Sequence, residues 1–314
     1  MPESRTESFN QLARLQRVIT IAALTLAVSW GAWAYLAQWH VLGVVGLAVI
    51  FAGHAVVLAL EFVLMARVNA TDPAPTATFG QYLRAWYGEV LHAPKVFCWL
   101  QPFRSNLHAD HLPAASTRRG VLLVHGFFCN RGLWNDWLAR LTQLGHPCVA
   151  VNLGPVFGSI DDYLQAIEAA VLKLEAATGQ PPVIVAHSMG GLVARKWWAG
   201  THDAHRVHRL LTLGTPHHGT WLARFAPSTN ARQMRIGSRW LQSLQATEPA
   251  HHVTRMVCFY SHCDNIVFPA STATLHGAHS WHLTGVSHVH MVQREEPFEE
   301  LLRQLSQARP SVLL

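Results

Sequence analysis

The chain carries no Asp, Glu, Lys or Arg between Val18 and Leu60, and only residues 38–40 interrupt this apolar run. The apolar stretches on either side of the break, 18–36 and 41–65, are about 19 and 25 residues long. A helix of about 20 apolar residues crosses the hydrocarbon core of a bilayer, which is roughly 30 Å thick. We therefore expect two transmembrane helices joined by a short turn.

Three other interpretations of the run fit less well. A signal peptide has an apolar core of roughly 7–15 residues. A buried hairpin would need partner surface that the chain lacks, and an amphipathic surface helix would need a polar face. Gly43, Gly46 and Gly53 are expected to let the second helix pack closely on the first. Aromatic residues near the turn fit a membrane interface: Trp30, Trp33, Tyr35 and Trp39.

Basic residues predict the orientation of the hairpin. They lie at both ends of the apolar run but not in its turn: Arg5, Arg14, Arg17, Arg67 and Arg84. Positive charge stays on the cytoplasmic side, so both ends should face the cytoplasm. We expect a cytoplasmic tail at residues 1–17 and the two-helix anchor at 18–66. The five cysteines suggest no disulfide framework, which agrees with a reducing compartment.

Residues 67–118 form a linker and an aromatic connector. Residues 69–76 have the composition of a linker, and residues 79–103 mix aromatic with basic side chains. The connector can pack on the following domain or lie on the membrane surface, and packing is favoured. The net charge of +6 suits an anionic lipid surface. Nucleic acid is not an expected partner, because no recognition motif is present.

From residue 119 onward the pattern predicts one α/β domain, covering residues 119–314, because strands alternate with helices. Strands are expected at 120–124, 147–153, 183–186, 210–213, 255–260 and 280–283. Helices are expected at 133–144, 160–178, 189–199 and 297–308. Such alternation indicates a mainly parallel sheet flanked by helices.

Ser188 lies where an apolar strand turns directly into a helical pattern. The small residues Ala186 and Gly190 flank it, which lets the strand and the helix approach closely. This is the layout of a nucleophile elbow, in which the serine hydroxyl is exposed on a strained turn. The first N–H groups of such a helix point at the reaction site. Gly126 follows the strand expected at 120–124, so the N–H groups of Phe127 and Met189 are candidate oxyanion donors.

A serine of this kind needs an acid and a histidine, which follow it in that order. The acids between Ser188 and the last helix are Asp203, Glu248 and Asp264. Asp264 comes just past an apolar strand, where the site of a parallel sheet lies, so it is the predicted acid.

Five histidines follow that acid, at positions 276, 279, 282, 288 and 290. A loop directly after the last strand can bring an imidazole over the serine. His288 is therefore the predicted base, with His290 as the alternative. The neighbouring pair His217-His218 lacks the acid arrangement of a metalloprotease, so no metal site is expected.

With these motifs, residues 119–314 resemble the α/β-hydrolase superfamily, and within it the bacterial triacylglycerol lipases and esterases. The AHSMGG elbow is similar to that of Bacillus-type lipases, and GTPHHGT is similar to a segment common in such enzymes. The resemblance implies Ser188 as nucleophile, Asp264 as acid and His288 as base, with Phe127 and Met189 as oxyanion donors. It implies no metal or organic cofactor. Residues 220–248 fall where these enzymes often carry a lid, although a simple covering helix is equally compatible.

The sequence thus predicts a multi-pass protein of a bacterial inner membrane with a cytoplasmic catalytic domain. It would cleave lipid or small carboxylic esters as a serine hydrolase, through an acyl-enzyme intermediate. An acyltransferase using the same residues, or a non-catalytic interaction module, are the alternatives. The sequence leaves the acyl length, the head group and the oligomeric state open.

Overall fold

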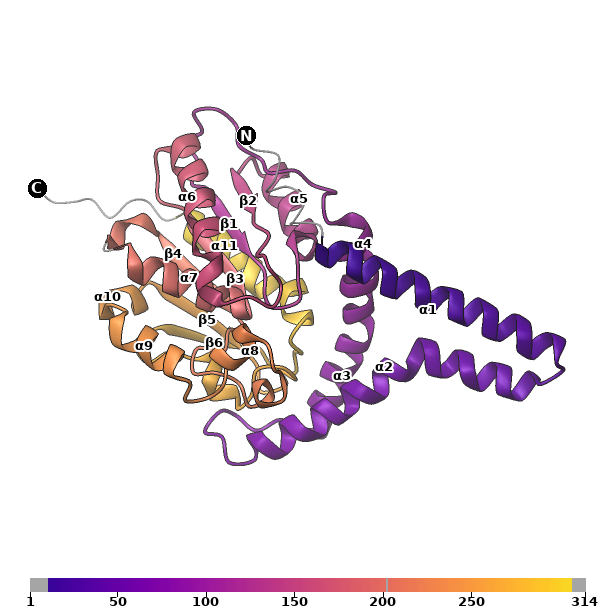
Figure 1. Ribbon diagram of the computed structural model, residues 1–314. Coiled ribbons are helices and arrows are strands. Elements are labelled where there is room, and N and C mark those ends of the chain that lie inside the picture. Colours follow the sequence, from indigo (N-terminus) through magenta and orange to yellow (C-terminus); the bar gives the residue numbers. More distant parts are fainter. Residues whose placement is uncertain (1–10, 202, 307–314) are drawn as a thin grey trace, which may run out of the picture.

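The computed structural model describes residues 11–201 and 203–306. Figure 1 shows a layered α/β domain from which two long helices project. The predicted architecture, a mainly parallel sheet with flanking helices, is confirmed. Residues 1–10 of the expected tail, and the end of the helix expected at 297–308, lie outside the described residues.

All six strands of the domain run parallel in one sheet, in the order β2-β1-β3-β4-β5-β6. The strands are β1 (Val121–Val124), β2 (Cys148–Ala150), β3 (Val183–His187), β4 (Arg209–Leu213), β5 (Met256–Tyr260) and β6 (His279–His282). The chain moves outward from β1 to β2 and then in the opposite direction from β3 onward. At such a reversal the loops after adjacent strands part, and ligands bind at the carboxyl ends of the strands.

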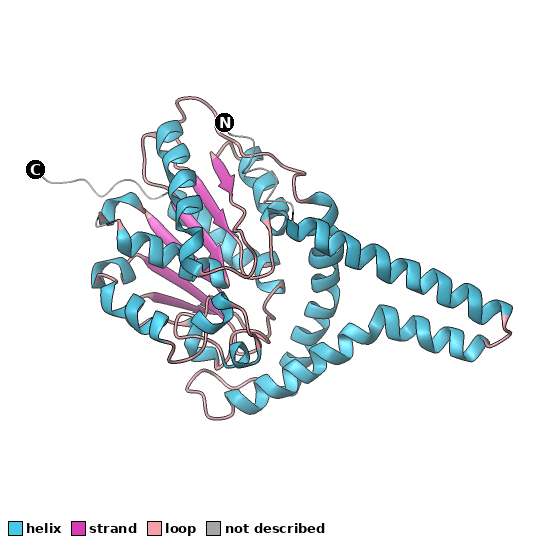
Figure 2. Ribbon diagram, viewed as in Figure 1, coloured by secondary structure: helices cyan, strands magenta, loops and turns pink. Residues whose placement is uncertain are grey.

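Helices cover both faces of the sheet (Figure 2). The helical segments around it are η4 (Arg131–Trp134), α5 (Asn135–Gln143), η5 (Ile160–Tyr163), α6 (Leu164–Thr178), α7 (Met189–Gly200), η6 (Ala204–Arg206), η7 (Trp221–Phe225), α8 (Thr229–Gln233), α9 (Arg239–Thr247), α10 (Ala250–Val253), η8 (Ala270–Ala273), η9 (His290–Gln293) and α11 (Glu295–Ser306). Val121 and Leu123 of β1 pack with α5 and α11, whereas Leu122 and Val124 pack with α6, α7 and α9. Because both faces are covered, the strand is apolar throughout instead of alternating.

The two long helices α1 (Gln11–Leu36) and α2 (His40–Asn69) form a hairpin. Both are long and apolar enough to cross a membrane, and only 11% and 6% of their most apolar stretches are buried. A core helix of a soluble protein would be largely buried. The outer faces of the hairpin therefore present apolar side chains to the surroundings.

The hairpin is close-packed only near its turn. A Cβ on Gly43 would lie 2.9 Å from the Cβ of Ala34, and one on Gly46 would overlap the ring of Trp30. These two glycines do let the helices approach, as predicted. The expectation for Gly53 is wrong, because no atom of α1 lies within 4 Å of a Cβ built there. By this point the helices have separated, and Figure 1 shows them diverging toward the domain.

The connector bridges the separated ends of the hairpin. It consists of α3 (Phe79–Pro94), the π-helical segment η3 (Lys95–Leu100) and α4 (Gln101–Arg104). Trp86 donates a hydrogen bond to the Ala55 carbonyl of α2 at 2.9 Å. At the other end Gln16 of α1 donates to Gln101 at 2.8 Å. In Figure 1 the three helices α1, α2 and α3 enclose a triangle whose base lies against the domain.

One buried ion pair fastens α7 to the segment after α9. Arg195 donates to both carboxylate oxygens of Glu248, at 3.0 and 2.6 Å. The two side chains are only 1% and 4% exposed. Removing one partner would leave the other charge buried without compensation, which typically costs about 3–5 kcal/mol.

We expect Arg195→Ala to lower the midpoint of thermal unfolding in detergent by roughly 6–20 °C, given about 2–4 °C per kcal/mol for a domain of this size. Glu295→Ala is the matched control, because its ion pair with Arg140 is exposed and contributes at most about 1 kcal/mol. Equal midpoints for the two variants would contradict this account of the pair.

Candidate active site

Ser188 lies on a strained turn between β3 and α7. Its backbone has φ +55° and ψ −130°, a conformation that costs free energy and recurs at functional sites. A Cβ on Gly190 would lie 2.5 Å from the His125 carbonyl oxygen, and one on Gly126 would lie 2.6 Å from the Cβ of Ser188. Glycine is therefore required at both positions, and the predicted strand–turn–helix is present.

One candidate oxyanion donor lies in the loop after β1, and the other is the first residue of α7. Met189 begins α7, so its N–H has no acceptor within the helix. Phe127 follows β1, which pairs with β3 in a register that sets Val124 beside Ala186. Within the described residues no hydrogen bond uses the Phe127 N–H. Their role as oxyanion donors stays a prediction.

His288 and Asp264 form a buried hydrogen-bonded pair. The distance between His288 Nδ1 and Asp264 Oδ2 is 2.9 Å, and the residues are 4% and 1% exposed. The other carboxylate oxygen, Oδ1, accepts the N–H groups of Ile266 and Val267 at 2.9 and 2.8 Å. These bonds fix the carboxylate, so that it in turn fixes the imidazole and leaves Nε2 free for chemistry.

The residues considered as alternatives have other partners. Glu248 binds Arg195, and Asp203 is exposed and caps η6 through the His205 N–H at 2.8 Å. The ring of His290 stacks on His92 of the connector, with ring centres 4.3 Å apart. Asp203 and Glu248 therefore do not bind His288, and His290 does not bind Asp264.

Glu89, which the sequence analysis did not single out, holds the loop of the candidate base. This residue of α3 is 2% exposed, and its carboxylate accepts the N–H groups of Val289 at 3.2 Å and His290 at 3.3 Å. Burial raises the pKa of Glu89, and these two hydrogen bonds act against that shift. It is the only acid between residues 73 and 109, which is the one sequence signal that could have identified it.

The second helix of the hairpin reaches the same loop through Asn265. The side-chain oxygen of Asn265 accepts the His288 N–H at 3.3 Å. Its amide nitrogen donates to Glu61 of α2 at 2.9 Å. Glu61 is the only acidic residue of α2. The structure shows that it orients the amide that holds the backbone of His288.

The electrostatic surroundings of His288 favour its protonated form. Burial lowers the pKa of the imidazole, but the charge and hydrogen bond of Asp264, with further charge from Glu89 and Glu61, outweigh burial and raise it above 6.5. His187 behaves in the opposite way. Burial first, and then the neighbouring His288, hold its pKa well below 6.5, so it is neutral beside the His288 carbonyl oxygen, 3.2 Å away.

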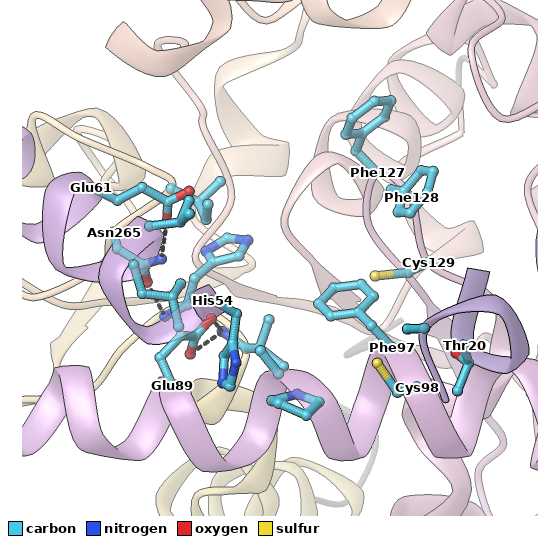
Figure 3. A pocket seen from close by; sticks show the side chains of 18 of the residues that line it. Thr20, His54, Glu61, Glu89, Phe97, Cys98, Phe127, Phe128, Cys129 and Asn265 are labelled. Atoms are coloured by element: carbon cyan, nitrogen blue, oxygen red, sulfur yellow. Dashed lines mark hydrogen bonds between the residues drawn. The ribbon is translucent and has the colours of Figure 1, made fainter. Parts of the chain in front are cut away.

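Ser188 and His288 both line a cavity of about 700 Å³. Figure 3 shows its opposite sides, with Phe127 and Phe128 on one and Glu61, Asn265 and Glu89 on the other. Its volume falls in the range of roughly 300–1,000 Å³ that is usual for small-molecule sites. Much of the wall comes from α1, α2 and α3, and among its described residues none comes from 220–248. A lid at 220–248 stays a prediction.

Comparison with known proteins agrees with this fold. Residues 121–257 match the model of the alpha/beta hydrolase family. The mature form of the Bacillus licheniformis lipase BlEst2 superposes with a TM-score of 0.54 at 17% identity, covering 62% of this chain and 95% of that one. Its propeptide form gives 0.53 at 18% identity, covering 64% and 53%. No curated protein sequence matches the chain. The chain thus has the α/β-hydrolase fold, preceded by two apolar helices.

If His288 is the base, the low-pH limb of kcat/KM for p-nitrophenyl butyrate should lie above pH 6.5. The base must be neutral to accept a proton, and its pKa is raised. Glu89→Gln removes a nearby negative charge while keeping the side-chain size, so the limb should move to lower pH.

Glu299→Gln, an exposed acid of α11, should leave the pH profile unchanged. A purely structural role for Glu89 would lower kcat without moving the limb. That result would contradict the electrostatic role of this carboxylate.

Proposed function

We propose that the α/β-hydrolase domain of this chain is a serine hydrolase that cleaves carboxylic esters of apolar, lipid-like substrates. The observation that carries the proposal is the shared cavity, since Ser188 and His288 both line it and Asp264 binds the far side of the imidazole. The strained backbone of Ser188 supports its role as nucleophile. The known lipase with the same fold is compatible with ester chemistry.

In the proposed reaction Ser188 Oγ attacks the ester carbonyl while His288 Nε2 accepts its proton. Asp264 keeps Nδ1 of His288 protonated and stabilises the imidazolium that forms. The N–H groups of Phe127 and Met189 stabilise the negative charge on the carbonyl oxygen. His288 returns the proton to the leaving alcohol. Water, activated in the same way, then releases the acid from the acyl enzyme.

We further propose that α1 and α2 cross a bacterial inner membrane and keep the domain in the cytoplasm. Their exposed apolar faces support this, as does the aromatic cluster at the turn, where Trp33 lies 5.4 Å from Trp39 between ring centres. Arg17 lies in the second turn of α1 and Arg67 in the last turn of α2, so both lie far from the turn of the hairpin. Two spans return the chain to its starting side, so the segment before α1 and the domain share a compartment.

The nucleophile is tested with a fluorophosphonate probe on the full chain in detergent. Ser188→Ala should abolish both labelling and turnover of p-nitrophenyl butyrate. His288→Ala should lower turnover by roughly four or more powers of ten, as is typical for residues of this kind. His290→Ala is the matched control and should retain activity within several fold, because its ring contacts the connector.

Labelling that persists in Ser188→Ala, or a larger loss in His290→Ala than in His288→Ala, would contradict the assignment. An added alcohol acceptor separates the two reaction types, since an ester product in place of free acid would identify an acyltransferase. A wild-type chain that neither labels nor turns over would point to a non-catalytic interaction module.

The topology is tested by fusing reporters to the C-terminus. A reporter active only in the cytoplasm should give signal, and one active only outside should give none. Signal from the external reporter alone would mean that the hairpin is inverted or that only one helix crosses.

A further inference from the structure

We propose that the anchor helices are also the acyl-binding wall of the site, and that a long-chain lipid ester enters it directly from the bilayer between α1 and α2. This inference rests on the proposed ester hydrolase activity and names the substrate class as membrane-resident, long-chain esters. The acyl chain would occupy the cavity, with its ester carbonyl at Ser188.

The first support is where the cavity wall comes from. Thr20, Ala23 and Leu24 of α1 face it from one side, and α2 contributes residues from Ile50 to Glu61. The rise from Ile50 to Glu61 is about 16 Å along α2, so the wall extends well into the expected span. Ser188, on the turn between β3 and α7 of the hydrolase domain, lines the same cavity.

The second support is the shape of the hairpin. Its helices touch at Gly43 and Gly46 but have separated by Gly53, next to the first cavity residues of α2. Both helices line the cavity, and they diverge toward the domain (Figure 1). A hairpin that served only as an anchor could stay packed along its whole length.

The third support is that side chains of the wall are exposed at the same time. Leu24, Phe51 and Val57 line the cavity and are 50%, 57% and 57% exposed. Other parts of the described chain therefore do not cover these apolar side chains, and the cavity is open beside them. A lipid chain beside these residues meets apolar atoms on both sides of the opening, so its passage exposes no apolar surface to water.

Most of the cavity residues that α1 and α2 contribute are apolar. His54 is the only polar side chain of α2 between His40 and Glu61, and its Nε2 lies 3.2 Å from the Val90 carbonyl oxygen of α3. Glu61 accepts a hydrogen bond from Asn265, whose side-chain oxygen binds the His288 N–H. The ester end of a substrate therefore meets the polar end of the cavity, and its acyl end meets the apolar end.

The test places bulky side chains in the cavity by substitutions in α1 and α2, and leaves Ser188, His288 and Asp264 unchanged. In full-length protein in vesicles, Leu24→Trp and Val57→Trp should each lower kcat/KM for p-nitrophenyl palmitate at least tenfold. Both should leave turnover of p-nitrophenyl acetate, and labelling of Ser188 by a small fluorophosphonate, within twofold. The matched controls Leu26→Trp and Val56→Trp lie on the same helices, are 57% and 64% exposed and do not line the cavity, so they should change neither.

The entry route is tested with dioleoylglycerol in the same vesicles as the protein or in separate vesicles. Hydrolysis should be much faster in the first case, and equal rates would contradict entry from the bilayer. Suppose that wild-type protein hydrolyses short esters and that all four Trp variants have the same kcat/KM for p-nitrophenyl palmitate. The proposed acyl-binding site is then wrong, while the proposed ester hydrolase activity stands. If wild-type protein hydrolyses no ester at all, the proposed activity fails and this inference fails with it.

Discussion

The buried carboxylate of Glu89 joins the two parts of this molecule. It lies on the connector, yet it accepts the backbone N–H groups that directly follow His288. A carboxylate that is 2% exposed needs such partners, because burial without them carries a large desolvation cost. The connector and the loop of His288 therefore depend on each other. The hairpin adds a second link through Glu61 and Asn265, so the site is complete only with the helices that precede the domain.

The sheet supplies the remaining constraint. Because β1 and β3 are parallel neighbours at the reversal of strand order, the loops carrying Phe127 and Ser188 open at the same edge. The glycines at 126 and 190 allow these backbones to approach. The hydrolase domain thus provides the proposed reactive groups of the cavity, and the diverging helices α1 and α2 provide much of the rest of its wall.

The sequence predicted the parts of this structure that depend on local patterns. The six strands, the turn at Ser188 and the two apolar helices were all readable from local sequence patterns and small residues. Contacts between distant segments were not, because no local pattern reports that Glu89 meets Val289 two hundred residues later. The divergence of the hairpin at Gly53 was missed for the same reason. Close to Gly53, α2 contacts the connector, where Trp86 donates a hydrogen bond to the Ala55 carbonyl, and no atom of α1 lies within 4 Å of a Cβ built on Gly53.

The central claim is that Ser188 and the helices α1 and α2 belong to one site. A single cross-linking measurement tests this claim most directly. A fluorophosphonate with a long alkyl chain and a terminal photoreactive diazirine would be attached to the full-length protein in vesicles and irradiated. The account predicts attachment at Ser188 and cross-links to cavity residues of α1 and α2, within 20–24 and 50–58. Cross-links concentrated in residues 220–248 would contradict it, because the acyl chain would then lie under a lid of the domain and not against the anchor.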